Sequence, residues 1–290
     1  MKCRLFVGLA FCVVLAQCVA LARDESGPAA IVSELQGSAT VKEPGTAQRA
    51  LEIYDWVGEG ASIAVSKGTR VVIVLTSGAR FALKERARVT VLRAGLPASA
   101  GVEPLPPFPP LPVVAPIASA AVPAISAATR VRGSSIRNLY PSGHSTLADG
   151  TTLRFDGPRG VTGYLVTIED QTGAPVWRQE IEHGAVTVPP DVLEPGRRYR
   201  WRVTAIGNSD PPLSASGAFV TLSASAARTR ITLRSALAAG DLGSLILLAR
   251  VDEQLGLLRE ARESVATAAA TAPEDRAIQQ LLARIEKQFQ

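Results

Sequence analysis

Residues 29–92, AAIVSELQGSATVKEPGTAQRALEIYDWVGEGASIAVSKGTRVVIVLTSGARFALKERARVTVL, decide the fold of the N-terminal part of the chain. Short runs rich in β-branched residues alternate with breaks centred on glycine, and no run has the length or the period of a helix. Residues 69–75 have the unbroken apolar character of a buried strand, and Ser77-Gly78 is typical of a tight hairpin turn. The pattern predicts about six strands wound into a compact all-β domain over residues 29–95.

The order of short motifs along this stretch resembles the FecR-type periplasmic domain. The shared order is an apolar run at 30–32, then Gly37, Leu51, Asp55 and Gly60, and a closing strand at 89–91. Ser77-Gly78 stands where the family usually has Asp-Gly. The resemblance implies sensing or assembly in the cell envelope through protein or glycan contacts. Signalling members also carry a cytoplasmic tail that restrains a sigma factor; four residues precede the first apolar segment here, so a FecR-like regulator of signal transduction is not the expected design.

The composition is that of a folded, strand-rich protein. Hydrophobic residues make up 47% of the 290 residues and charged residues 20%, with 24 glycines and 20 prolines. A chain of this length accommodates two or three small domains, each with its own core. The net charge of +5 is spread along the whole sequence. So small a surplus predicts no nucleic-acid partner.

Residues 1–22 have the three parts of a secretory signal peptide. Lys2 and Arg4 give a positive start, residues 5–14 an apolar core, and Ala20 and Ala22 a small-x-small cleavage site. We therefore expect an exported protein, periplasmic or secreted. No later stretch is apolar enough to span a membrane, so we expect no transmembrane segment in the mature chain.

Two alternatives stay open for this segment. One is an uncleaved anchor, because residues 5–22 form an uncharged run at the short end of spanning length. The other is lipidation at Cys18, since Leu15-Ala16-Gln17-Cys18 resembles the lipobox of an outer-membrane lipoprotein. All three cysteines lie within residues 1–22. A mature chain without them has no disulfide, no thiolate nucleophile and no cysteine ligand for a metal.

Residues 96–128 are rich in proline and are expected to be a linker. Proline at this density favours extended polyproline II, which makes a semi-rigid spacer. Residues 104–107 also have the PxxP form of a groove ligand, but such matches arise by chance in any proline-rich tract. Apolar residues such as Phe108 and Leu111 are unusual in a free linker. Docking of the linker on one of the domains is therefore left open.

A second β region is predicted over residues 129–223. Residues 151–155, 164–168, 176–180 and 199–203 alternate in the two-residue period of half-buried strands. The stretch 193–205, LEPGRRYRWRVTA, resembles the fibronectin type III strand that carries the tyrosine corner. That resemblance makes Tyr199 and Trp201 framework residues of a β-sandwich. Their alternation with arginines also suggests an aromatic and basic ligand face, but alternation puts the two sets on opposite faces of the strand.

The last part, residues 225–290, has a helical pattern. Helices are expected over 226–239, 242–255 and 258–271, with a fourth through Phe289 after Pro273. Small and apolar residues over 245–273 fall at the spacing of one tetratricopeptide repeat, with Asp252 in place of the usual aromatic residue. A single repeat cannot bury its own face. It must therefore pack on flanking helices, on a β domain or on another protein.

No arrangement of residues predicts catalysis. His144 and His183 lie in sequences typical of turns, and neither is followed by a second metal ligand three or four residues later. A hydrolase that uses His144 is one hypothesis, but no nucleophile elbow accompanies it. No phosphate-binding or dinucleotide-binding glycine motif is present. We therefore expect no enzyme activity, no cofactor and no metal site.

Together these features predict a mainly β protein with a C-terminal α segment: a FecR-like domain, a proline-rich linker, a fibronectin-III-like sandwich and tetratricopeptide-like helical hairpins. The expected function is that of a non-enzymatic binding or scaffold protein of the bacterial cell envelope, with envelope proteins as partners. The alternative is a protein that binds peptidoglycan or another glycan, with Tyr54 and Trp56 as a stacking surface. The other interpretation of Tyr54 and Trp56 is core packing beside a turn.

Overall fold

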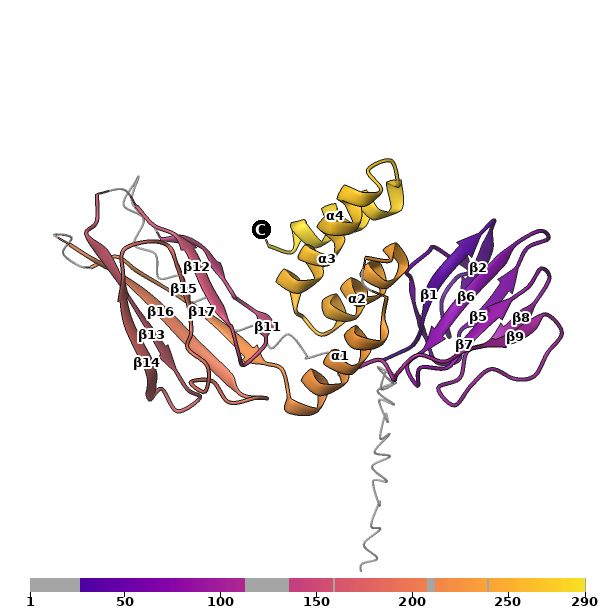
Figure 1. The fold of residues 1–290 in the computed structure, drawn as a ribbon, viewed down its shortest axis with the longest axis horizontal. Coiled ribbons are helices and arrows are strands. Elements are labelled where there is room, and N and C mark those ends of the chain that lie inside the picture. The colour runs from indigo at the N-terminus through magenta and orange to yellow at the C-terminus, as the bar shows by residue number, and fades with distance from the viewer. Residues whose placement is uncertain (1–26, 113–135, 159, 208–211, 239, 290) are drawn as a thin grey trace, which may run out of the picture.

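The computed structural model of the chain describes residues 27–112, 136–158, 160–207, 212–238 and 240–289. Two β domains lie at opposite ends, and a helical segment lies between them (Figure 1). The expectation of a mainly β protein with a C-terminal α segment is confirmed. The segment 1–22, with Ala20, Ala22 and Cys18, is outside the described residues. Among the helices of the described part, none is long and apolar enough to cross a membrane.

The first domain consists of two sheets, with strand orders β4-β1-β6-β7-β9 and β3-β2-β5-β8. Its strands are β1 (Pro28–Gln36), β2 (Ala39–Lys42), β3 (Arg49–Ala50), β4 (Trp56–Gly58), β5 (Ser62–Val65), β6 (Arg70–Leu75), β7 (Arg80–Leu83), β8 (Arg88–Thr90) and β9 (Val102–Leu105). The described part therefore has more strands than the six or so expected. The additional ones are short pieces such as β3, and β9, which lies in the proline-rich stretch.

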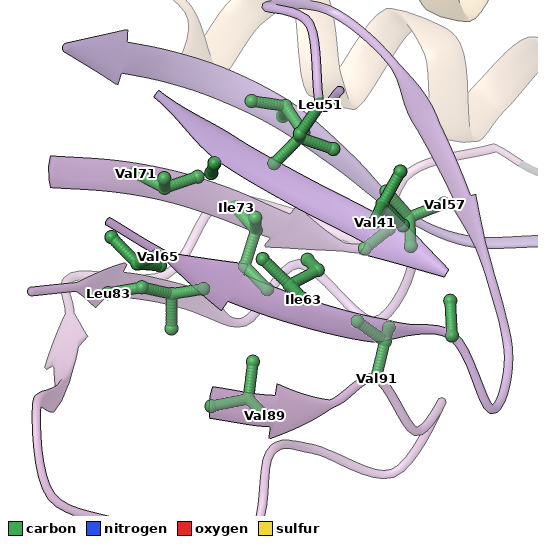
Figure 2. Packing of buried hydrophobic residues seen from close by; sticks show 14 of the residues in the cluster. Val41, Leu51, Val57, Ile63, Val65, Val71, Ile73, Leu83, Val89 and Val91 are labelled. Carbon is green, nitrogen blue, oxygen red and sulfur yellow. The ribbon is translucent and has the colours of Figure 1, made fainter. Parts of the chain in front are cut away.

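The core of this domain lies between the two sheets (Figure 2). On β6, Val71 and Ile73 point into that core together with Ile63 of β5. Val74 of β6 points the other way and joins a cluster with residues of the helical segment. This explains the unbroken apolar run of β6, because both of its faces are covered.

The first part of the expected linker belongs to the first domain. β9 pairs with β7 at the edge of the sheet. Beyond it, Phe108 N donates to Gly78 O and Leu111 N donates to Thr76 O, both at 2.9 Å. Arg80 lies over the Phe108 ring, 4.1 Å from its centroid. The expectation of a spacer over 96–128 is therefore corrected for residues 102–112, where backbone hydrogen bonds fix the chain to the sheet; residues 113–128 are outside the described part.

The second domain is a fibronectin-III-like sandwich of two sheets, with orders β10-β12-β15 and β11-β17-β16-β13-β14. Its strands are β10 (Arg137–Tyr140), β11 (His144–Thr146), β12 (Thr152–Asp156), β13 (Gly163–Glu169), β14 (Pro175–Ile181), β15 (Ala185–Thr187), β16 (Arg198–Ile206) and β17 (Ser214–Thr221). The four alternating runs in the sequence correspond to β12, β13, β14 and β16. β10, β11, β15 and β17 correspond to none of these runs. In β17, three consecutive buried residues interrupt the two-residue alternation.

The helical segment contains α1 (Ala224–Ala236), α2 (Leu242–Gln254), α3 (Leu258–Thr271) and α4 (Arg276–Lys287). Side-chain caps fix three of the starts: Ser223 accepts from Ala226 N, Asp241 from Ser244 N, and Asp275 from Ala277 N. α2 packs against α3 and α3 against α4 around a cluster of alanine, valine and isoleucine side chains. The helix ranges agree with the sequence-based ones to within a few residues.

Candidate functional site

The junction between the helical segment and the first domain is a shared hydrophobic cluster. Ile31 of β1 and Val74 of β6 are fully buried there against Val251 of α2. Leu111, from the docked proline-rich stretch, belongs to the same cluster, as does Leu222 at the end of the second domain. The first domain therefore depends on the helices to cover the outer face of its β1–β6 sheet.

The turn that carries Tyr54 and Trp56 lies at this junction. Tyr54 has a φ of 68°, and its carbonyl oxygen accepts a hydrogen bond from Nε of Arg250 at 2.9 Å. Its side chain packs against the α2–α4 cluster. Burial, with the carboxylates of Asp275 and Asp241, raises the pKa of Tyr54 to about 12. The structure thus brings Tyr54 and Trp56 to the helices instead of to an open face of the first domain.

An open cavity of about 330 Å³ remains beside Trp56. Its other walls are Arg250, Glu253, Gln254 and Arg284. Glu253 accepts from Arg250, and Nη2 of Arg284 lies 3.5 Å from the same carboxylate. The two guanidinium groups of this cavity therefore share one carboxylate. A ligand in this cavity would contact one aromatic wall and polar side chains that are hydrogen-bonded to one another.

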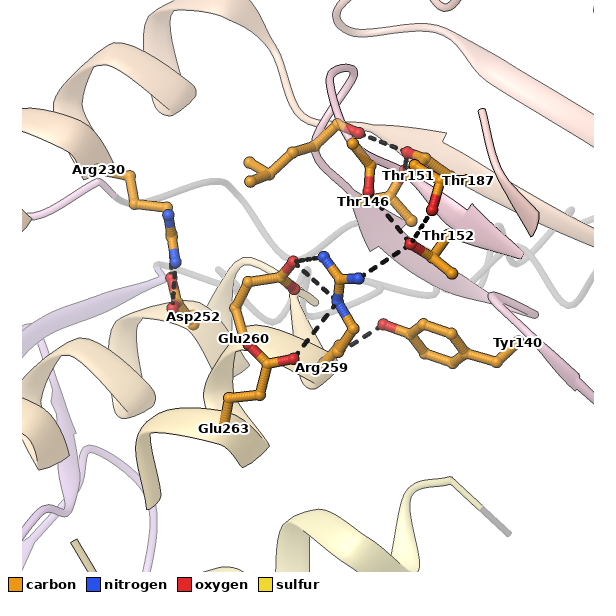
Figure 3. A network of polar contacts seen from close by, with 12 residues as sticks. Tyr140, Thr146, Thr151, Thr152, Thr187, Arg230, Asp252, Arg259, Glu260 and Glu263 are labelled. Carbon is orange, nitrogen blue, oxygen red and sulfur yellow. Dashed lines mark hydrogen bonds and ion pairs between the residues drawn. The ribbon is translucent and has the colours of Figure 1, made fainter. Parts of the chain in front are cut away.

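Polar contacts join the helical segment to the second domain (Figure 3). The N–H of Ser145 on β11 donates to Gly256 O at 3.1 Å, in the turn between α2 and α3. Arg259 of α3 donates from its backbone N–H to Tyr140 Oη at 3.3 Å and from Nη1 to Thr152 Oγ1 at 3.2 Å. Burial and the carboxylate of Glu260 raise the pKa of Tyr140 to about 12. Its hydroxyl therefore stays neutral and acts as a structural hydrogen-bonding group.

At the C-terminal end of the chain, an aromatic contact also joins the helical segment to the second domain. The ring of Phe289 lies 5.3 Å from that of Tyr140 and 6.5 Å from that of His144, measured between centroids. Burial lowers the pKa of His144. Within the described residues, no hydrogen bond joins His144 to a hydroxyl or a carboxylate. The surroundings of His144 are therefore those of a packing residue, and His183 is exposed in the turn after β14.

The framework residues lie in the core of the second domain. Tyr199 Oη accepts from the backbone N–H of Glu194 at 2.8 Å, in the form of a tyrosine corner. Trp201 is fully buried, and its Nε1 donates to Pro141 O at 2.8 Å. The neighbouring arginines Arg198, Arg200 and Arg202 are exposed on the opposite face of β16. An aromatic and basic ligand face is therefore absent from this strand.

A buried ion pair inside the helical segment was not predicted. Asp252 of α2 and Arg230 of α1 are joined by two hydrogen bonds of 2.5 and 2.7 Å, and both side chains are almost completely buried. Burial raises the pKa of Asp252 to about 6, although the hydrogen bonds from Arg230 oppose this. The signal available in the sequence was the carboxylate at position 252, where an aromatic residue was expected. In the described part of the chain, no group of three His, Cys, Asp or Glu side chains is arranged to hold a metal ion.

Taken together, the described residues define a multidomain, mainly β protein whose two β domains are joined by a helical bridge. No family model and no curated protein matches the chain. Among solved structures it is similar to a cell surface anchoring domain, with 19% identity over 23% of this chain and 90% of that one, at a TM-score of 0.23. It is also similar to the FN1–FN3 domains of chicken CNTN1, with 13% identity over 68% of this chain and 57% of that one, at a TM-score of 0.23.

Proposed function

We propose that this chain is an exported, non-enzymatic scaffold of the bacterial cell envelope that binds envelope proteins through its two β domains. The observation that supports this most strongly is the helical bridge. Ile31 of the first domain, Leu222 of the second and Val251 of α2 share one buried cluster. Such a bridge holds two binding domains in a fixed relation, which is what an adaptor needs and a linker of polyproline would not provide.

The finer assignments belong to this proposal. The first domain is FecR-like in the order of its motifs, and the helical segment is tetratricopeptide-like in its spacing. A tetratricopeptide-like hairpin normally buries its face against further repeats. Here α2 covers the β1–β6 sheet instead. This arrangement is consistent with a helical segment that serves as a structural bridge.

Export and binding can be tested together in a bacterial host. We expect the N-terminus of the mature chain to follow Ala22, and the chain to be found outside the cytosol and to cross-link to the same envelope proteins in repeated preparations. Val251→Asp, which places a charge in the shared cluster, is expected to reduce this cross-linking. Ile231→Asp is the matched control, because Ile231 of α1 is 60% exposed. A mature chain located in the cytosol would contradict the proposal.

The alternative function is binding of peptidoglycan or another glycan. It is favoured by one observation, that Trp56 forms an aromatic wall of the open cavity of about 330 Å³. Aromatic rings are suitable partners for the apolar faces of sugars. In a sedimentation assay with peptidoglycan, this alternative predicts binding that Trp56→Ala abolishes and that Leu92→Ala, at a position of the first domain that is 40% exposed, leaves unchanged. Absence of co-sedimentation would leave protein binding as the proposed function.

A further inference from the structure

The strand β14 is unlike the other edge strands of this protein. In the residues that the structure describes, each of the four sheets ends in two edge strands, and all of these except β14 have two to four residues. β14 has seven residues, and β13 is its one partner in the described part of the chain. Proteins usually keep edge strands short, because a long open edge pairs readily with another strand. β14 is therefore the strongest candidate for pairing between molecules.

The hydrogen-bond alternation identifies the backbone groups of β14 that face outwards. Ala205 N donates to Leu213 O at 2.8 Å, so odd-numbered residues of β16 bond to β17 and even-numbered ones to β13. In β13, the odd-numbered residues therefore bond to β16 and the even-numbered ones to β14. The residues of β14 opposite these even-numbered residues are odd-numbered, so the odd-numbered residues of β14 bond to β13. The N–H and C=O groups of Arg178 and Glu180 therefore point to the open edge.

The side chains of β14 also alternate. Trp177 and Ile181 pack against the core of the second domain. Arg178 and Glu180 are exposed on the outer face of the sheet, and the residues opposite them on β13, Thr167 and Leu165, carry no charge. Each of these two charges can therefore find an opposite charge on a strand added at the open edge.

A second copy of the same strand is complementary to this edge in one antiparallel register. With Gln179 facing the partner's Gln179, Arg178 lies opposite the partner's Glu180 on the outer face. Trp177 then lies opposite the partner's Ile181 on the inner face. A shift by two residues would instead place Arg178 opposite the partner's Arg178, or Glu180 opposite the partner's Glu180. Opposite charges in facing positions stabilise a strand pair and like charges destabilise it.

We propose that two copies of this chain dimerise by antiparallel pairing of their β14 strands about a two-fold axis at Gln179. Such an interface is isologous and continues the sheet from one molecule into the other. β14 lies on the side of the second domain away from the helices (Figure 1). Pairing there leaves the helical bridge and the first domain of each copy accessible, and it does not depend on which envelope partner the protein binds.

Sedimentation velocity over a wide range of concentration tests the proposal, because a contact of one strand per copy is smaller than the interface of a permanent dimer. We expect dimers to form as the concentration rises from about 1 µM to about 1 mM. Arg178→Glu and Glu180→Arg, each alone, put like charges opposite each other twice in the interface. Each is expected to weaken dimerisation at least about tenfold.

Two further experiments test the register of the strand pair, because each is expected to restore dimerisation. The double variant Arg178→Glu/Glu180→Arg re-creates both ion pairs and is expected to dimerise like the original chain. A mixture of the two single variants is expected to form heterodimers, because one strand then carries two acidic and the other two basic side chains. Arg198→Glu is the matched control, since Arg198 is exposed on β16 in the same sheet. Its dimerisation is expected to be unchanged.

The proposal is overturned if the chain stays monomeric up to about 1 mM. It is also overturned if the single charge reversals dimerise as well as the original chain, or if the double variant does not recover. Circular dichroism of each variant separates loss of pairing from loss of folding.

Discussion

At the scale of single residues, the helical segment contains one interaction whose loss is costly, the buried pair of Asp252 and Arg230. Asp252→Ala leaves the guanidinium buried without a counter-charge. We expect it to lower the free energy of unfolding by about 3–5 kcal/mol in urea denaturation. The double variant Asp252→Leu/Arg230→Met replaces the pair by apolar side chains of similar size and is expected to be close to neutral. A single variant as stable as the original chain would show that the pair contributes no stability.

A second residue-scale prediction concerns His144, whose pKa is lowered by burial against Phe289 and Tyr140. The unfolded imidazole titrates near its ordinary value of 6.5, so on acidification the unfolded state binds a proton before the folded state does. The stability contribution is therefore complete above pH 6.5 and is lost as the pH falls through the lowered pKa of the folded state. His144→Phe keeps a ring and removes the titration.

Urea denaturation at several values between pH 8 and pH 5 measures this effect. We expect the free energy of unfolding to fall less steeply with decreasing pH in His144→Phe than in the original chain. At pH 8 the imidazole is neutral in both states, so the two proteins can be compared there for any change in packing alone. Parallel pH profiles would mean that burial does not disfavour the imidazolium.

At the scale of elements, the docking of the proline-rich stretch depends on Gly78. Gly78 has a φ of +90°, and a Cβ there would lie 2.2 Å from Phe108 O. Gly173 has a similar φ of +87° but no atom within 4 Å of such a Cβ. Gly173→Ala therefore measures the backbone strain alone, about 1–2 kcal/mol. Gly78→Ala adds a clash with the docked stretch. We expect it to lower the free energy of unfolding by about 1–2 kcal/mol more than Gly173→Ala does, because the clash weakens the hydrogen bonds of Phe108 and Leu111 to the sheet.

Thermal or urea denaturation of the two alanine variants checks this difference. Proteolysis gives a second readout, because a released stretch is cut more readily than one that is hydrogen-bonded to the sheet. Equal loss of stability in Gly78→Ala and Gly173→Ala, with unchanged proteolysis, would contradict the docking of residues 102–112.

The elements also show what the sequence could and could not predict. The four helices were predictable, because residues such as Asp241, Gly256 and Pro273 mark their ends locally. β9 was not, because proline removes the alternation and the hydrogen-bond donors by which a strand is recognised. The framework position of Tyr199 followed from a local motif. The place of Tyr54 and Trp56 did not, because it depends on helices about 200 residues further along the chain.

At the scale of the whole molecule, the account is that of two β domains held by one helical bridge. The bridge contacts the first domain through apolar side chains and Arg250, and the second through Gly256 and Arg259. Sequence patterns predicted each part separately. They could not predict the junctions, because the side chains that meet there, such as Ile31 and Val251, are ordinary members of their own strand and helix patterns.

Spin-label distances between the two β domains test this central claim most directly. Labels are placed on Thr90→Cys of β8 and Ala185→Cys of β15, two exposed positions, in a chain whose Cys3, Cys12 and Cys18 are replaced by serine. A dilute sample is expected to give one narrow distance distribution, which Val251→Asp broadens and Ile231→Asp leaves narrow. A distribution that is broad from the outset, or one that Val251→Asp does not change, would contradict the helical bridge.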